Sequence, residues 1–111
     1  MSKTRLQLAN RALDKLRIVG IGQSPEAEDT EKVNNVIDSF VEWLANDIYT
    51  IADVEEIDEA PFEWIADLLA WFCAPDFFKP RDLAAKALAE MELQKITATR
   101  PTYERMTAEY F

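Results

Sequence analysis

The feature that most constrains the fold is a long run of apolar residues in the middle of the chain. Between residues 33 and 48 they recur every three or four positions, which is the period of one face of an α-helix. The run consists of Val33, Val36, Ile37, Phe40, Val41, Leu44 and Ile48. Ser24 and Pro25 precede it and suit the cap and first position of a helix. Because such a face must be buried against another element, the run predicts a helical bundle.

Glycine and proline residues divide the rest of the chain into three further helical segments. We expect helices over about residues 4–18, 61–74 and 81–97, the first ending at Gly20 and Gly22, the only glycines. No segment alternates apolar and polar residues over a useful length. The predicted fold class is therefore all-α, a small antiparallel bundle of about four helices over residues 1–98, followed by an extended C-terminal tail, 99–111.

Two of these helices carry specific expectations about their faces. In the first, the apolar residues at helical spacing are Leu6, Ala9, Leu13 and Leu16. In the fourth, which is rich in alanine, the residues expected to face inward are Leu83, Ala84, Ala87, Leu88 and Met91. Small residues of this kind permit a close approach between helices.

The third helix is apolar around an unusually wide arc. Only Glu63 and Asp67 mark a polar stripe, and the apolar sector spans about 200°, against about 100° for an ordinary amphipathic helix. Such a helix is either central in its own bundle or covered by a second copy of the chain. The second reading predicts a subunit contact at Trp64, Leu68 and Trp71.

The C-terminal sequence RPTYERMTAEYF poses a separate question. Pro101 disfavours a helical conformation at Arg100, so the fourth helix is expected to end there. The large apolar residues beyond it are too few to form a core of their own. The residues that we expect to dock on another chain are Arg100, Pro101, Tyr103, Arg105, Met106, Tyr110 and Phe111.

The net charge of −9 is concentrated in one part of the chain. Residues 1–17 hold five cations and one acid, whereas residues 18–60 hold twelve acids and one cation. This balance argues against nucleic-acid binding as the main activity, because phosphate recognition relies on lysine and arginine. The sequence also has no apolar run long enough to span a membrane and no signal peptide. The single cysteine, Cys73, rules out an internal disulfide and is typical of a reducing compartment.

No catalytic or cofactor site is indicated by the sequence. The chain has no histidine, which excludes histidine-based acid–base chemistry and histidine metal ligands. Cys73 lies in an apolar helix and is expected to be a buried structural thiol. The acids at 53–59 lack the central glycine of a calcium loop, and an enzyme built on carboxylates alone is the weakest hypothesis. We expect no enzyme activity, no cofactor and no metal.

The order of these signals resembles a known family. The segment from ANRALDKL through VGIGQSPEAED carries a short helix, a glycine turn and the start of a long helix. The break APDFFKP, an alanine-rich helix and TATRPTYE follow. This order, over about residues 4–105, resembles the head-to-tail adaptor proteins of tailed bacteriophages, the tail accessory factor or packaged-DNA stabilisation family. The matching residues are Gly20, Gly22, Gln23, Ser24, Pro25, Pro75, Phe77, Pro80, Arg100 and Pro101.

The resemblance implies a structural virion protein. Several copies, usually twelve, would form a ring beneath the portal protein, extend the DNA channel and join head to tail. It implies assembly in the host cytoplasm, residence in the virion neck, and contacts with the portal, other copies and tail-side proteins. The tail would dock on the portal or a neighbour, and the acids would keep DNA from adhering to the channel. The alternative from another class is a small acidic protein-binding module, such as an inhibitor that mimics the charge of DNA.

Overall fold

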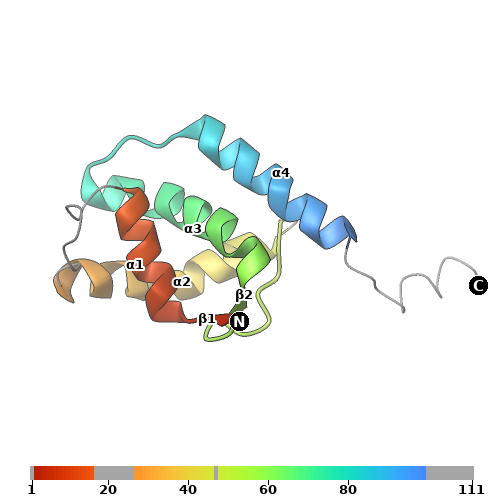
Figure 1. Ribbon diagram of the computed structural model, residues 1–111. Helices are drawn as coiled ribbons and strands as arrows, with labels where there is room; N and C mark the ends of the chain where they lie inside the picture. The colour runs from red at the N-terminus through yellow and green to blue at the C-terminus, as the bar shows by residue number, and fades with distance from the viewer. Residues whose placement is uncertain (1, 17–26, 47, 100–111) are drawn as a thin grey trace, which may run out of the picture.

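The computed structural model describes residues 2–16, 27–46 and 48–99. Within these ranges the chain forms four α-helices, a single turn of 3-10 helix and a minute two-stranded sheet (Figure 1). The predicted all-α class is thereby confirmed. The α3 helix (Glu59–Cys73) lies at the centre and contacts each of the other three helices. The central reading of its wide apolar arc is therefore correct for a single chain.

The local sequence explains where the first helix begins. The α1 helix (Arg5–Lys15) starts after Thr4, whose hydroxyl accepts a hydrogen bond from the backbone of Gln7, while the Gln7 side chain accepts one from the Thr4 backbone. This reciprocal pair satisfies two N–H groups that a helix start leaves free. The buried face comprises Leu8, Ala9, Ala12 and Leu13. Leu6 is 58% exposed, because it lies in the first turn, at the edge of that face.

The apolar run between residues 33 and 44 forms the buried face of the second helix, as predicted. The α2 helix (Ala27–Ala45) buries Val33, Ile37, Phe40 and Leu44 completely, and Val36 and Val41 are partly buried beside them. Ile48 belongs to the connector after the helix, although it still packs against the core. The start predicted at Ser24 and Pro25 lies outside the described residues.

The connector between α2 and α3 is better anchored than its acidic composition suggests. Ile57 is buried, and β2 (Ile57–Asp58) pairs antiparallel with β1 (Ser2–Lys3), Lys3 lying opposite Ile57. The sheet was not predicted, because two-residue strands are too short to show alternation. Pro61 lies in the first turn of α3, where no backbone donor is required, so this helix starts two residues before the predicted position.

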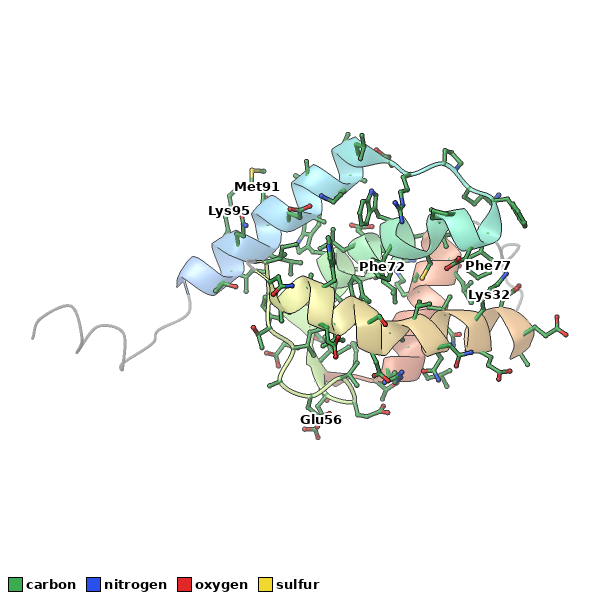
Figure 2. The ribbon with its side chains drawn as sticks, turned by 180° about the vertical axis from the view of Figure 1, so that it is seen from behind. Lys32, Glu56, Phe72, Phe77, Met91 and Lys95 are labelled. Carbon is green, nitrogen blue, oxygen red and sulfur yellow. The ribbon has the colours of Figure 1, made fainter. Side chains whose placement is uncertain are left out.

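A short break separates α3 from the last helix. Residues Ala74–Phe77 form a 3-10 turn, η1, and Phe78 follows in the left-handed conformation with φ 58°. The N–H of Lys79 donates to the carbonyl of Ala74, and that of Phe78 donates to Pro75. The Lys32 ammonium of α2 donates to the Asp76 carbonyl and lies 4.9 Å from the Phe77 ring centroid, which ties the break to α2 (Figure 2).

The last helix lies along α3 on the side away from α2 (Figure 1). The α4 helix (Leu83–Thr99) begins after Asp82, whose carboxylate accepts a hydrogen bond from the Ala85 N–H. It buries Ala89 and Leu93 against the core, and Ile96 is partly buried. The predicted inward face of this helix is wrong, because its large apolar residues lie in solvent on the opposite side.

Candidate interaction surfaces

Among the described residues, the outer face of α4 carries several large apolar side chains that are exposed to solvent. The residues expected to face inward instead lie in solvent: Leu83 is 69% exposed, Leu88 and Met91 are each 46% exposed, and Ala84 and Ala87 are exposed between them. At 100° per residue this set points about 180° away from Ala89 and Leu93, which are fully buried. The helix has two apolar faces at helical spacing, and α3 covers the one that contains Ala89 and Leu93. We call the exposed set, Leu83, Ala84, Ala87, Leu88 and Met91, the α4 outer face.

Charged residues border the α4 outer face at both ends. Lys95 lies one turn beyond Met91, and its 63% exposed side chain pairs with Glu92 at 3.4 Å (Figure 2). Arg81, just before the helix, donates to the backbone carbonyls of Trp71 and Phe72 at the end of α3. The α4 outer face is therefore an apolar surface whose bordering cations already have partners within the chain.

The predicted subunit-contact residues have different surroundings. Leu68 is fully buried within one chain, which removes it from the predicted contact. Trp64 is only partly buried against the core, and Trp71 stacks on Trp43 with ring centroids 5.5 Å apart. The wide apolar arc of α3 is therefore largely covered by α1, α2 and α4.

Two cations cover the Trp71 ring from the α4 side. The Arg81 guanidinium lies 4.5 Å and the Lys86 ammonium 4.9 Å from its centroid, and Lys86 also pairs with Glu90. These contacts stabilise the packing of α4 on α3. The indole N–H of Trp71 is buried and has no hydrogen-bond acceptor among the described residues.

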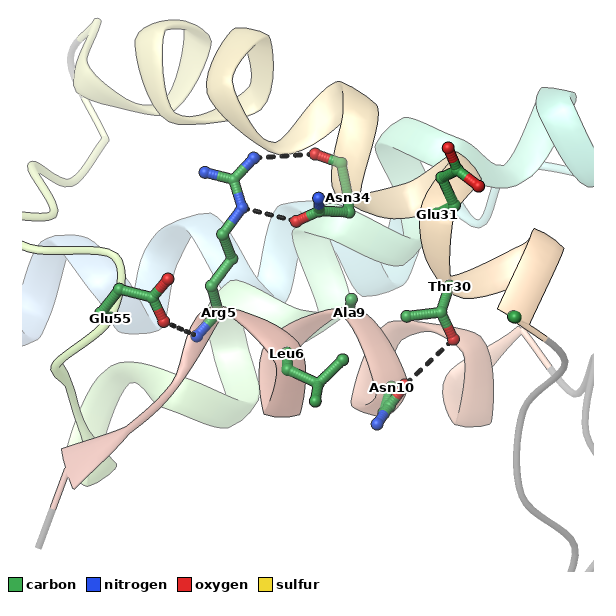
Figure 3. A pocket seen from close by; sticks show the side chains of 9 residues that line it. Arg5, Leu6, Ala9, Asn10, Thr30, Glu31, Asn34 and Glu55 are labelled. Atoms are coloured by element: carbon green, nitrogen blue, oxygen red, sulfur yellow. Dashed lines mark hydrogen bonds between the residues drawn. The ribbon is translucent and has the colours of Figure 1, made fainter.

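A groove of about 880 Å³ lies where α1 meets α2 (Figure 3). Leu6, Ala9 and Ala27 supply apolar surface, and Glu31 and Glu55 supply negative charge. We call this the α1–α2 groove. Sequence reasoning missed it, because it depends on how two helices cross.

Arg5 holds one wall of the α1–α2 groove in place. Its guanidinium donates to the Asn34 side chain at 2.6 Å and to the Asn34 carbonyl at 2.8 Å (Figure 3). It also pairs with Asp38 at 2.8 Å. The Arg5 backbone N–H donates to Glu55. Because Asp38 balances Arg5, Glu31 and Glu55 leave the groove with a negative charge.

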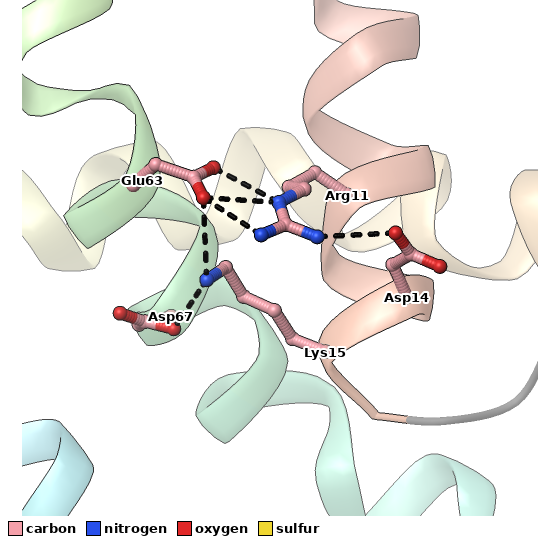
Figure 4. A network of polar contacts seen from close by, with 5 residues as sticks. All are labelled: Arg11, Asp14, Lys15, Glu63 and Asp67. Carbon is pink, nitrogen blue, oxygen red and sulfur yellow. Dashed lines mark hydrogen bonds and ion pairs between the residues drawn. The ribbon is translucent and has the colours of Figure 1, made fainter.

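On another side of α1, an ion network joins it to α3 (Figure 4). The Arg11 guanidinium donates to both oxygens of Glu63, at 2.8–3.1 Å, and to Asp14 at 3.1 Å. Lys15 lies 2.8 Å from Asp67. Hydrogen bonds from Arg11 hold the pKa of Glu63 below its ordinary value, and burial only partly opposes this effect. The polar stripe predicted on α3 thus fixes the orientation of α1.

In the described part of the chain, the thiol and carboxylate side chains do not come together in a catalytic or metal-binding arrangement. Cys73 is buried, and burial raises the pKa of its thiol to about 12, as expected for a structural cysteine. In residues 2–16, 27–46 and 48–99, no cluster of three acidic or cysteine side chains is arranged to hold a metal ion. Across the same ranges, no helix combines the length and apolar character needed to cross a bilayer.

Several residues singled out from the sequence lie outside the described ranges. These are the turn residues Gly20, Gly22, Gln23, Ser24 and Pro25, and the docking residues Arg100, Pro101, Tyr103, Arg105, Met106, Tyr110 and Phe111. Of the second break, Pro75 and Phe77 belong to η1 and Pro80 precedes α4.

Comparison with protein-family models, curated proteins and solved structures finds no match to this chain.

Proposed function

We propose that this protein is a non-enzymatic structural subunit of the head-to-tail connector of a tailed bacteriophage. Copies of the chain form a ring, of twelve subunits by analogy with the adaptor family that the sequence resembles, beneath the portal protein. The observation that carries the proposal is the α4 outer face. A chain that fills its core with other residues, yet leaves Leu83, Leu88 and Met91 exposed on one helix, has a surface suited to another protein.

The charge of the molecule agrees with a position around passing DNA. The exposed acids include Glu28, Glu31, Asp38 and Glu42 on α2 and Glu55 and Glu56 on the connector. An acidic wall repels phosphates and gains nothing from counterion release, so DNA slides past it. We therefore expect no binding to duplex DNA in a gel-shift assay at physiological salt, and salt-sensitive retention would contradict the channel role.

The remaining partners follow from the same proposal. The C-terminal segment from Arg100 to Phe111 docks on the portal or on a neighbouring copy, with Tyr103, Met106, Tyr110 and Phe111 as apolar anchors. Tail-side proteins bind the opposite rim of the ring. Assembly takes place in the host cytoplasm, and the finished ring stays in the virion neck.

Electron microscopy of the protein mixed with a phage portal protein tests the proposal directly. The expected result is a ring of copies seated on the portal, with density continuous around the DNA channel. A variant that ends at Thr99 should keep the helical circular-dichroism spectrum and lose attachment to the portal. If the full-length protein neither binds the portal nor forms rings at any concentration, the connector role is wrong.

A second candidate function is supported by the acids on α2. Glu28, Glu31, Asp38 and Glu42 are all exposed and recur at helical spacing along one face. A row of carboxylates of this kind can imitate a phosphate backbone and occupy the DNA site of a basic protein. Such an inhibitor would act as a monomer or dimer, and charge reversal along the row would abolish its binding. Ring formation on a portal would exclude this reading.

A further inference from the structure

We propose that Phe78 is an anchor that inserts into an apolar pocket of another protein. The inference rests on the proposed function, because it assigns this contact to the tail-side protein that the ring would bind. Three observations carry it: the exposure of the Phe78 ring, the backbone conformation that presents the ring, and the contacts that hold the surrounding residues. We call residues 74–81 the Phe78 turn.

Phe78 combines two features that are each unfavourable in the free chain. Its side chain is 96% exposed, more than any other large apolar residue in the described ranges. Its backbone is left-handed, with φ 58° and ψ 33°, and no other non-glycine residue in the described part of the chain has a positive φ. For a bulky residue this conformation is a steric outlier. A glycine would make the same turn without either cost, so the presence of the ring indicates a function.

Hydrogen bonds fix the Phe78 turn on both sides of the ring. The Phe78 N–H donates to the Pro75 carbonyl at 3.1 Å. The Lys79 N–H donates to the Ala74 carbonyl at 3.0 Å. On the other side, the Arg81 guanidinium donates to two backbone carbonyls at the end of α3. The ring is therefore presented from a fixed backbone, and binding would require little further ordering of the chain.

Contacts with α2 give the two neighbouring phenylalanines opposite positions. The Phe77 ring packs against the core, and the Lys32 ammonium lies 4.9 Å from its centroid (Figure 2). Lys32 also donates to the Asp76 carbonyl at 3.0 Å. With Phe77 held in this way, the left-handed residue that follows places its own ring in solvent. The exposure of Phe78 thus belongs to a well-anchored turn.

The surroundings of Phe78 favour a protein partner over a lipid surface. A single exposed apolar residue is ordinary, but a ring on a strained and fixed backbone has the character of an aromatic anchor in a protein interface. The charges beside the ring are mixed, since Asp76 and Lys79 are both exposed. An anionic membrane would attract the lysine and repel the carboxylate. The rim of a protein pocket can offer a partner to each of them.

The position of the Phe78 turn identifies which partner of the proposed ring it faces. Phe77 and Lys95 lie at opposite ends of the molecule (Figure 2). Lys95 is near the end of α4, which stops at Thr99, so the C-terminal segment starts at the end away from Phe78. In the proposed connector, docking of that segment on the portal leaves the Phe78 turn facing the tail. The pocket is therefore assigned to the tail-side protein.

Substitutions at position 78 test the anchor in rings of the full-length protein assembled on a phage portal protein. The probe is a purified tail-side protein of the same phage, and its affinity for the rings is measured by surface plasmon resonance. Phe78→Asn tolerates the left-handed conformation and removes the ring, so we expect a loss of about tenfold or more. Phe78→Tyr keeps the ring and should retain most of the affinity. Equal affinity of Phe78→Asn and the unchanged rings, or no binding by the unchanged rings, would overturn the proposal.

A second exposed apolar residue supplies the matched control. Leu6 is 58% exposed and lies outside the Phe78 turn, so Leu6→Asn should bind the tail-side protein as tightly as the unchanged protein. Thermal melts accompany each measurement, and Phe78→Asn should melt no lower than the unchanged protein, because the ring has little packing in the free chain. A loss of affinity shared by Leu6→Asn, or a lower melting temperature of Phe78→Asn, would attribute the effect to folding and contradict the anchor.

Photochemical cross-linking identifies what the ring touches. Phe78 is replaced by p-benzoylphenylalanine, and the assembled complex of portal, ring and tail-side protein is irradiated. We expect a link to the tail-side protein, and none when Leu6 carries the same replacement. A link to the portal or to a neighbouring copy would overturn the assignment. Sedimentation with phosphatidylcholine–phosphatidylglycerol vesicles that is lost in Phe78→Asn would overturn it in favour of a lipid surface.

The outcomes separate this inference from the connector role. Rings on the portal that bind the tail-side protein regardless of the residue at position 78 would disprove the anchor and leave the connector role intact. A cross-link from position 78 to the tail-side protein without rings on the portal would support the anchor and disprove the ring. If neither rings nor links form, both are wrong.

Discussion

The orientation of α4 leads to a quantitative test with two leucines on the same helix. Leu93 is fully buried against the core, whereas Leu88 is 46% exposed on the α4 outer face. The sequence pattern predicted the opposite for Leu88. Replacing each by alanine removes the same atoms and leaves helix propensity almost unchanged. The difference in stability between the two variants therefore reports which face is buried.

The expected magnitudes follow from the two environments. Leu93→Ala removes a buried side chain and leaves a cavity, which costs about 3 kcal/mol of unfolding free energy. Leu88→Ala loses about half of the burial of three carbon atoms and creates no cavity, so we expect about 1 kcal/mol. In a domain of this size, each kcal/mol moves the melting temperature by about 4–8 °C. Leu93→Ala should therefore melt about 12–24 °C lower than the unchanged protein.

Urea and thermal unfolding followed by circular dichroism at 222 nm measure both variants. Both variants are measured at several low protein concentrations. A midpoint that does not change with concentration shows that self-association does not contribute to the measured stability. If Leu88→Ala costs as much as Leu93→Ala or more, α4 faces the other way. The α4 outer face would then be buried, and the connector proposal would lose the surface that carries it.

Three further predictions concern single residues. Phe78→Gly should raise stability by about 0.5–1 kcal/mol in a thermal melt, because glycine adopts the left-handed φ of 58° without the steric cost that phenylalanine pays; a lower melting temperature would show that the exposed ring has packing value. The lowered pKa of Glu63 adds stability that is present above its ordinary pKa of 4.5 and is lost as the pH falls through the lower folded-state value; urea midpoints at pH 6 and pH 3 should therefore differ less in Glu63→Gln than in the unchanged protein. The Cys73 thiol, with its pKa raised to about 12, should not react with a disulfide reagent at pH 8 until the protein is unfolded; rapid reaction of the native protein would contradict its burial.

The local features of the fold were readable from the sequence because they depend on near neighbours. The apolar run from Val33 to Leu44 has one possible helical face, so its burial followed from spacing alone. The polar stripe of Glu63 and Asp67 was equally clear, although its partners Arg11 and Lys15 lie about 50 positions away and were not predictable. The capping pair of Thr4 and Gln7, which places the start of α1, is also local, although it was not predicted.

The candidate surfaces were less predictable, because each depends on contacts between distant segments. The α1–α2 groove is lined by residues of α1, α2 and the connector, and Arg5 links its walls by reaching Asn34 and Asp38. The subunit contact expected at Leu68 does not survive, since a single chain already buries this residue. The predicted docking tail lies outside the described residues, so its role stays a prediction.

The amino-acid sequence by itself determined that this chain is helical, where its helices lie approximately, and that its charge is unevenly distributed. Periodicity and turn residues act over a few positions, so they are fully present in the sequence. The tertiary structure alone decided which face of α4 is buried. Both faces have apolar residues at helical spacing, and the choice depends on α3, which buries Ala89 and Leu93 and leaves Leu83, Leu88 and Met91 in solvent.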